Sequence, residues 1–286
     1  MTEIVLFPGQ GSQVKGMGAE LFGRYPDLTA EADRVLGYSI AELCLDDPRD
    51  ELGRTQFTQP ALFVANALTY RASLEDGAAP PACVAGHSLG EYNALLAAGC
   101  FDFATGVTLV KQRGELMGRV SGGGMSAVIG LEPDAIQAAL ESTEEGRRVD
   151  VANLNSFEQT VMAGPKEDLA AVKGTLEAAG ARMVIPLNVS APFHSRYMRD
   201  AQREFEGFLE GFEFRAPSIP VISNVTARPY GADAVRATLA GQIGNSVRWL
   251  DSMLYLLEMP EPGFREAGPG QVLTKLIKQI RKKTGT

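Results

Sequence analysis

Residues 83–91 read Cys83-Val84-Ala85-Gly86-His87-Ser88-Leu89-Gly90-Glu91, an apolar run that leads into a Gly-x-Ser-x-Gly element and then a helix-like stretch. The two flanking glycines allow a sharp turn from strand to helix, which exposes the serine oxygen and points backbone N–H groups toward a developing oxyanion. The segment predicts a serine nucleophile and acyl transfer through an ester on Ser88. A glycine-flanked turn serine with a structural role is the alternative.

The same alternation of short apolar runs and helical patterns occurs elsewhere in the chain. Ile4 to Phe7 precedes a helical stretch over Met17 to Phe22, and Cys83 to Ala85 precedes one over Glu91 to Ala98. This order predicts an α/β fold, in which helices cover a parallel sheet.

Two more helices are marked by their N-terminal residues. Asp102 is suited to cap a helix that runs to about Val120. The run Thr58-Gln59-Pro60-Ala61 begins a helix that continues to Leu74, with Pro60 in its first turn.

The pattern changes after Ser121-Gly122-Gly123-Gly124, which we interpret as a flexible break. The next stretch predicts a strand, a helix, two strands, a helix and a strand, in the order Ala127–Leu131, Asp134–Leu140, Val149–Leu154, Thr160–Ala163, Lys166–Ala179 and Arg182–Leu187. This is the order of a ferredoxin-like unit, which closes as a small domain. We therefore expect residues 124–187 to form an inserted subdomain, and residues 1–123 and 188–286 to form one large α/β domain.

Bulk composition excludes several classes of protein. The 286 residues are 45% hydrophobic and 22% charged, which is typical of a folded globular chain. A net charge of -8 argues against a nucleic-acid partner, because phosphate binding needs a basic surface. No apolar run is long enough to cross a membrane, and the N-terminus lacks the basic region of a signal peptide. We expect a cytoplasmic protein, and a monomer.

The three cysteines, Cys44, Cys83 and Cys100, are odd in number and follow no pattern typical of disulfides or zinc ligands. We therefore expect reduced, buried thiols and no metal. A basic cluster near the C-terminus is either a binding patch or, as we prefer, the solvated end of a helix: Lys275, Lys278, Arg281, Lys282 and Lys283.

A serine hydroxyl is a weak nucleophile without a base, and the chain has only two histidines. His87 precedes Ser88 on a tight turn, where neighbouring side chains diverge, so we expect it to pack beside the nucleophile. His194 lies where the chain re-enters the large domain, beside the expected cleft between the domains. His194 is therefore the candidate general base, although a lone histidine is more often a packing residue.

A third element is the glycine-rich loop Phe7-Pro8-Gly9-Gln10-Gly11-Ser12-Gln13, which follows the first expected strand. It lacks the lysine of a Walker A loop and the spacing of a dinucleotide fingerprint, so it is a poor match to a phosphate cradle. Loops after parallel strands gather at one edge of a sheet, which places this loop near Ser88. Gln10 could then donate a side-chain N–H to an oxyanion, alongside the backbone N–H of Leu89.

In this order, the motifs Pro-Gly-Gln-Gly-Ser-Gln, Gly-His-Ser-Leu-Gly-Glu and Pro-Phe-His-Ser resemble the malonyl-CoA:acyl carrier protein transacylase family and the acyltransferase domains of polyketide synthases. The resemblance extends from Ile4 to Ile280. It implies an α/β-hydrolase-like domain with a ferredoxin-like subdomain. It also implies malonyl-CoA as substrate, an acyl carrier protein as partner and no cofactor.

The resemblance assigns roles position by position. It implies that Ser88 is the nucleophile and His194 the general base, while Gln10 and the Leu89 backbone form the oxyanion hole. Where hydrolases of this fold place an acid behind the histidine, the family uses a backbone carbonyl, which here matches Gln242.

Two further positions concern the acyl group. The resemblance implies that Arg113 holds the free carboxylate of malonyl, a role that suits the parallel donors of a guanidinium. Leu89 and Phe193 match bulky residues that accompany selection of malonyl over methylmalonyl in polyketide relatives. One methyl group in an apolar pocket is worth only about 1 to 3 kcal/mol, so we expect incomplete selectivity.

The region from Tyr38 to Leu68 is most similar to stand-alone acyltransferases that serve polyketide synthases in trans, of the disorazole synthase acyltransferase type. The malonyl transacylase of fatty-acid synthesis has the same chemistry and is the nearest alternative. An acyl hydrolase acting on carrier proteins shares the Ser-His pair, and a non-catalytic carrier-binding module would share the fold.

Overall fold

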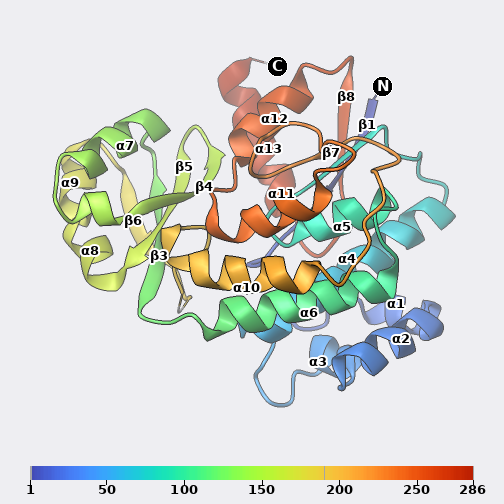
Figure 1. The fold of residues 1–286 in the computed structure, drawn as a ribbon. Coiled ribbons are helices and arrows are strands. Elements are labelled where there is room, and N and C mark those ends of the chain that lie inside the picture. Colours follow the sequence, from blue (N-terminus) through green and yellow to red (C-terminus); the bar gives the residue numbers. More distant parts are fainter. Residues whose placement is uncertain (1, 190, 286) are drawn as a thin grey trace.

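The computed structural model describes residues 2–189 and 191–285, so the end residues of the expected large domain, 1 and 286, lie outside the described residues. Its centre is a parallel sheet with the strand order β7-β2-β1-β8 (Figure 1). The strands are β1 (Thr2–Phe7), β2 (Cys83–Gly86), β7 (Val221–Ile222) and β8 (Pro262–Glu266). The expected α/β class with a parallel sheet is confirmed.

Helices surround this sheet. Those that come before the second sheet along the chain are α1 (Ala19–Arg24), α2 (Pro26–Leu36), α3 (Ile40–Leu45), α4 (Thr55–Glu75), α5 (Gly90–Ala97) and α6 (Phe103–Arg119). Those that follow it are η2 (Arg196–Met198), α10 (Arg199–Leu209), α11 (Val235–Gly241), η3 (Gln242–Gly244), α12 (Trp249–Leu257) and α13 (Val272–Thr284), where η denotes a 3₁₀ helix. Asp102 caps α6 as expected, because its carboxylate accepts the backbone N–H of Thr105.

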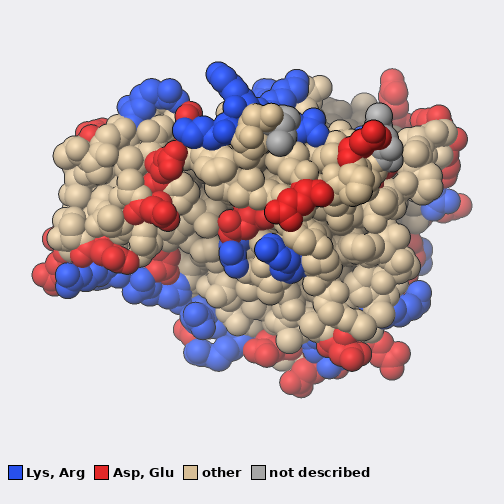
Figure 2. Space-filling view, turned by 90° about the horizontal axis from the view of Figure 1, so that it is seen from above, with Lys and Arg blue, Asp and Glu red and all other residues tan. Residues whose placement is uncertain are grey.

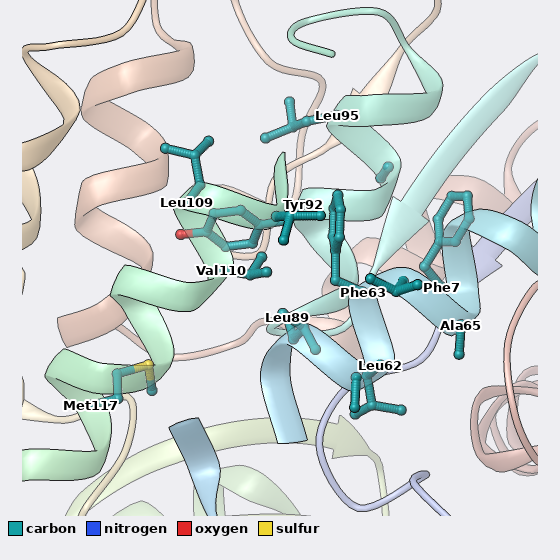
Figure 3. Close-up of a cluster of buried hydrophobic side chains, with 14 of the residues drawn as sticks. Phe7, Leu62, Phe63, Ala65, Leu89, Tyr92, Leu95, Leu109, Val110 and Met117 are labelled. Atoms are coloured by element: carbon teal, nitrogen blue, oxygen red, sulfur yellow. The ribbon is translucent and has the colours of Figure 1, made fainter. Parts of the chain in front are cut away.

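Alternate residues of β1 belong to two different hydrophobic cores, because successive side chains of a strand point to opposite faces. Val5 and Phe7 pack in a cluster with α4, α5 and α6. Ile4 and Leu6 pack in another cluster with α12 and α13. Figure 3 shows Phe7 beside Phe63 of α4 in the first cluster. The parallel sheet is thus buried on both faces, as parallel sheets generally are.

The second sheet lies to one side of the first (Figure 1). It is antiparallel, with the order β4-β5-β3-β6, and every strand pair in it is antiparallel. Its elements are β3 (Gly123–Ile129), α7 (Pro133–Glu141), η1 (Gly146–Arg148), β4 (Asp150–Ser156), β5 (Gln159–Pro165), α8 (Lys166–Ala171), α9 (Lys173–Ala178) and β6 (Met183–Pro186). This is the strand and helix order that the sequence predicts. The division of the chain into domains at residues 124 and 187 stays a prediction.

The expected place of Pro60 in the first helical turn is wrong. Helix α4 begins at Thr55, so Pro60 lies in its second turn. The first turn forms earlier because the backbone N–H groups of Phe57 and Thr58 both donate to the carbonyl of Arg54.

Two further expectations around the second sheet are wrong. Gly123 and Gly124 are not a flexible break but the first residues of β3, where they pair with Pro165 and Gly164. A Cβ at Gly123 would lie 2.7 Å from the ring of Pro192, so glycine permits this close packing. The single helix expected over residues 166–179 is two helices, and the break between them is confined to Val172, which keeps near-helical angles.

None of the described helices is both long enough and apolar enough to cross a membrane.

Candidate active site

Ser88 lies at the turn between β2 and α5, at the carboxyl edge of the parallel sheet. Its φ angle is +50°, a left-handed conformation that is uncommon for a residue other than glycine. The turn is tight on both sides, because a Cβ at Gly86 would lie 1.9 Å from the carbonyl carbon of Gly90, and one at Gly90 would lie 2.0 Å from the carbonyl oxygen of Phe7. The two glycines are therefore needed for space, and the predicted strand-turn-helix geometry is observed.

His194 faces Ser88 from the segment that follows β6. Its Nε2 lies 2.7 Å from Ser88 Oγ, and its Nδ1 lies 2.9 Å from the backbone carbonyl oxygen of Gln242. Since a carbonyl can only accept, Nδ1 carries the proton and Nε2 is left as the acceptor for the serine hydroxyl. The structure brings together the three residues that the sequence predicts as nucleophile, base and orienting group.

The imidazole of His194 is 4% exposed. Burial, and then the nearby Arg113 cation, lower the pKa of His194 to about 3 because both disfavour the imidazolium ion. The ring is therefore neutral near pH 7, which is the state in which it can accept a proton from Ser88.

Arg113 projects from α6 into the same site and is 1% exposed. Its Nη2 donates to Ser88 Oγ at 3.2 Å and to Gln242 Oε1 at 2.8 Å, while Nη1 donates to Gln59 Oε1 at 2.7 Å. The guanidinium also lies over the ring of Tyr92, with 5.4 Å from its carbon to the ring centroid. Its Nε has no hydrogen-bond partner among the described residues. The hydrogen bonds of the Arg113 guanidinium therefore go to neutral groups, one of which is the hydroxyl of Ser88.

Gln10 and Leu89 line the cavity in front of Ser88. The side-chain amide of Gln10 donates to Thr55 Oγ1 over a long 3.4 Å. Neither the backbone N–H of Gln10 nor that of Leu89 makes a hydrogen bond to another described residue. Leu89 is fully buried, and its side chain lies in the hydrophobic cluster (Figure 3).

His87 packs beside the nucleophile, as expected, and points away from it. Its Nε2 lies 2.8 Å from Asn155 Oδ1, and its ring lies 5.4 Å from the ring of Trp249. Burial lowers the pKa of His87, so this ring is also held neutral.

These groups border a cavity of about 460 Å³ that lies between the two sheets. Phe193 lines it next to the base, and Met125, Ala127 and Val161 line it from the second sheet. Lys275 of α13 also lines it. The cavity therefore joins an apolar wall to a polar, cationic one, which is typical of small-molecule sites.

Five buried or half-buried polar residues that contact this site were given no role from the sequence: Gln59, Glu91, Asn155, Asn224 and Tyr230. Gln59 and Glu91 lie within stretches to which the family resemblance applies, so their places along the chain stand out from the sequence, but their burial does not. Asn155 lies on β4 and in none of the motifs given above. Asn224 and Tyr230 follow β7 and lie in no motif. In the part of the chain that the structure describes, no three His, Cys, Asp or Glu side chains are grouped to hold a metal ion.

Comparison with known proteins places this chain among acyltransferases. The acyl transferase domain family matches residues 4–283. The polyketide biosynthesis malonyl CoA-acyl carrier protein transacylase BaeC of Bacillus velezensis is 53% identical over 280 residues, which are 98% of this chain and 96% of that protein.

Solved structures agree over the whole chain. The malonyl CoA-acyl carrier protein transacylase from Burkholderia pseudomallei has a TM-score of 0.95 and 49% identity, covering 99% of both chains. A malonyl-transacylase solved in complex with a type II polyketide synthase acyl-carrier protein has a TM-score of 0.93 and 40% identity, covering 99% of this chain and 94% of that one. These superpositions confirm the expected fold class. The protein whose site is described above is a member of the acyl transferase domain family.

Proposed function

We propose that this protein transfers malonyl from malonyl-CoA to the phosphopantetheine thiol of an acyl carrier protein, through an ester on Ser88. The observation that carries the proposal is that Ser88 Oγ is contacted by both His194 Nε2 and Arg113 Nη2. A neutral base and a buried carboxylate-binding cation thus meet at one nucleophile. The names of the relatives support the same reaction.

In the first half-reaction, His194 Nε2 takes the hydroxyl proton while Ser88 Oγ forms a bond to the thioester carbonyl carbon. The Gln242 carbonyl stabilises the resulting imidazolium through Nδ1–H. The backbone N–H groups of Gln10 and Leu89 stabilise the tetrahedral oxyanion, because neither has an acceptor among the described residues. For Gln10 this replaces the side-chain N–H expected from the sequence, which is directed at Thr55. When the intermediate collapses, the C–S bond breaks and His194 returns the proton to the coenzyme A sulfur.

The second half-reaction runs in reverse. His194 deprotonates the phosphopantetheine thiol, sulfur attacks the ester carbonyl, and the proton returns to Ser88 Oγ as the C–O bond breaks. Arg113 holds the free carboxylate of the malonyl group throughout, because a planar guanidinium matches a carboxylate with paired donors. These steps use side chains and backbone N–H groups of this chain.

Basic side chains lie near the cavity, which suits an acyl donor and an acyl acceptor that both carry phosphate. Coenzyme A and phosphopantetheine are such groups. Lys and Arg side chains gather around the C-terminal end of α13 (Figure 2). Lys275 lines the active-site cavity, and Lys282 and Lys283 line an adjoining hollow that shares Gln159 and Gln279 with it. Lys283 is also paired with Glu132 at 3.3 Å, in keeping with a solvated helix end.

The pathway and setting belong to the same proposal. The BaeC relative is a polyketide biosynthesis protein, which supports service to a polyketide synthase in trans. The three cysteines are free and buried, as in reducing compartments, which supports a cytoplasmic enzyme. We expect it to act as a monomer.

Intact mass spectrometry after brief exposure to malonyl-CoA tests the reaction. We expect a malonyl adduct on wild-type protein, none on Ser88→Ala, and loss of the adduct when a thiol-bearing carrier protein is added. Rapid hydrolysis of acyl carrier thioesters without malonyl loading would instead make the protein a hydrolase. Parallel assays with polyketide and fatty-acid carrier proteins would identify the pathway, and equal or better transfer to the fatty-acid carrier would contradict the polyketide assignment.

A further inference from the structure

Glu91 lies behind the site, at the start of α5, and is completely buried. It is not among the described residues that line the cavity. Its Oε2 accepts hydrogen bonds from the backbone N–H of Asn224 and from Gln242 Nε2, each at 2.9 Å. Its Oε1 contacts the hydroxyl of Tyr230. The hydrogen-bond donors around this carboxyl favour its ionised form, which opposes the effect of burial.

We propose that Glu91 is a positioning residue, whose carboxylate acts through Gln242 and Asn224 to hold the nucleophile, the base and the carboxylate-binding cation in place. The inference rests on the function proposed above and adds to it a group that touches neither substrate nor reacting atoms.

The first branch runs through Gln242. Its Nε2 donates to Glu91 and, at 2.8 Å, to the backbone carbonyl of Ser88, which leaves Oε1 facing Arg113 Nη2. The reverse orientation of the amide would set its NH₂ group against the guanidinium, donor to donor. The same residue supplies the backbone carbonyl that holds His194. Glu91 therefore anchors a residue that, like Ser88, contacts both the base and the cation.

The second branch runs through Asn224. While its backbone N–H is held by Glu91, its side-chain oxygen accepts the backbone N–H of Ser88 at 2.7 Å and its NH₂ donates to the carbonyl of Gly86 at 2.7 Å. These two bonds span the turn in which Ser88 adopts its positive φ. A left-handed conformation is strained for a residue other than glycine and persists only where surrounding contacts impose it.

The charge arrangement gives a reason for an indirect link. The Arg113 guanidinium is linked to Glu91 by hydrogen bonds through the Gln242 amide, so the buried anion compensates the buried cation without itself accepting a hydrogen bond from it. Arg113 Nε has no partner among the described residues, and Nη2 faces Ser88 Oγ. A direct ion pair would use the donors that the substrate carboxylate needs.

Three variants test the proposal. Glu91→Gln keeps the size of the side chain but replaces one acceptor oxygen with an NH₂ group that faces donors. Tyr230→Phe removes the hydrogen bond that fixes the orientation of the Glu91 carboxyl at Oε1, so we expect it to lower the labelling rate as well, but less than Glu91→Gln does. Asp168→Asn is the matched control, because Asp168 is another buried acid and lies on α8, outside the site. Its carboxylate pairs with Arg148 at 2.7 Å.

The primary readout is the rate at which a fluorophosphonate labels Ser88, which reports the reactivity of the serine without any acyl substrate. For folded Glu91→Gln we expect the maximal labelling rate to fall about 10- to 100-fold, since misplacements of about 1 Å can cost this much. The half-saturating probe concentration should change much less. Malonyl loading should show the same split, with a fall in kcat that exceeds any rise in KM.

The outcomes separate a positioning role from a structural one. Asp168→Asn should lower the melting temperature while leaving the labelling rate of the folded protein unchanged. If Glu91→Gln folds and is labelled at the wild-type rate, the proposal is overturned. If it does not fold, soluble Tyr230→Phe replaces it, and an unchanged labelling rate in that variant overturns the proposal equally. Labelled wild-type protein that fails to load malonyl would refute the proposed function alone.

Discussion

Arg113 Nη2 donates a hydrogen bond to Ser88 Oγ across 3.2 Å, so the buried cation lies directly against the nucleophilic atom. An acyl group esterified to Ser88 would therefore lie next to this guanidinium. Under the proposed function, we expect the free carboxylate of malonyl to bind this cation, whereas acetyl has no second carboxylate to bind it. The contact between these two residues therefore leads to a testable prediction about which acyl group the enzyme prefers.

We expect Arg113→Ala to reduce malonyl loading far more than acetyl loading, by about 100-fold or more, because the lost interaction is a charge-assisted hydrogen bond inside a buried site. Rates of acyl-enzyme formation from malonyl-CoA and acetyl-CoA measure the ratio. Arg119→Ala on the same helix is the control, since Arg119 is exposed and pairs with Glu204 at 3.4 Å. Equal losses for both substrates would make Arg113 a structural residue.

His194 should remain neutral through the physiological range. Because burial and the Arg113 cation lower its pKa to about 3, we expect its ring resonances not to titrate between pH 5 and pH 8. Arg113→Ala removes one of these two causes and should raise the pKa of His194. Nuclear magnetic resonance of ring-labelled histidine, assigned with a His87→Asn variant, measures both. A wild-type titration near pH 6.5 would be incompatible with the buried geometry.

Burial raises the pKa of Glu91 to about 7. The charged or titratable groups around it are Arg113, Tyr92, Tyr230 and His194. Of these, Arg113 stays charged, burial raises the pKa values of both tyrosines, and that of His194 is about 3. We therefore expect the labelling rate of Ser88 to rise between pH 6 and pH 8 as Glu91 ionises, and Glu91→Gln to abolish this rise.

The same carboxyl predicts the pH dependence of stability. The folded state holds the Glu91 proton up to about pH 7, whereas the unfolded carboxyl loses it near the ordinary value of 4.5. Between these values the folded state binds more protons, so this group makes the free energy of unfolding decrease as pH rises. Urea denaturation at pH 5 and pH 7 should show a smaller decrease for Glu91→Gln than for wild type.

Phe193 lines the cavity beside His194. We expect its side chain to limit the space next to the α-carbon of a bound acyl group. We expect Phe193→Ala to raise the use of methylmalonyl-CoA relative to malonyl-CoA by about 10-fold, the effect of room for one methyl group. Competition between the two thioesters, followed by mass spectrometry of Ser88, gives the ratio. An unchanged ratio would remove Phe193 from the selectivity of the site.

Gly90→Ala should destabilise the protein by at least about 3 kcal/mol, because its Cβ would lie 2.0 Å from the backbone oxygen of Phe7, which cannot move freely. Gly174→Ala is the matched control in α9, where an added Cβ meets nothing within 4 Å. It should stabilise by about 0.5 to 1 kcal/mol, since alanine loses less entropy in a helix than glycine. Denaturant midpoints compare them, and similar midpoints would contradict the tight turn.

Several features could be predicted from local patterns. The turn at Ser88 is specified by Gly86 and Gly90, whose missing side chains leave space that other residues would fill. Asp102 caps α6 through a residue three positions away. The two-sheet arrangement follows from the order of strands and helices. The positions of Pro60, Gly123 and Gly124 differ from those expected. Backbone hydrogen bonds to Arg54 and strand pairing with β5, not the preferences of these residues, set where α4 and β3 begin.

The support of the site could not be predicted in this way. Glu91 and Gln242 are 151 positions apart, and Asn224 lies 136 positions from Ser88, so only the packed strand order brings them together. Burial, which sets the pKa values of Glu91 and His194, likewise exists only once the two sheets enclose the site. Local sterics encode the nucleophile and its turn along the chain, but hydrogen-bond partners and electrostatic environment are properties of the closed fold.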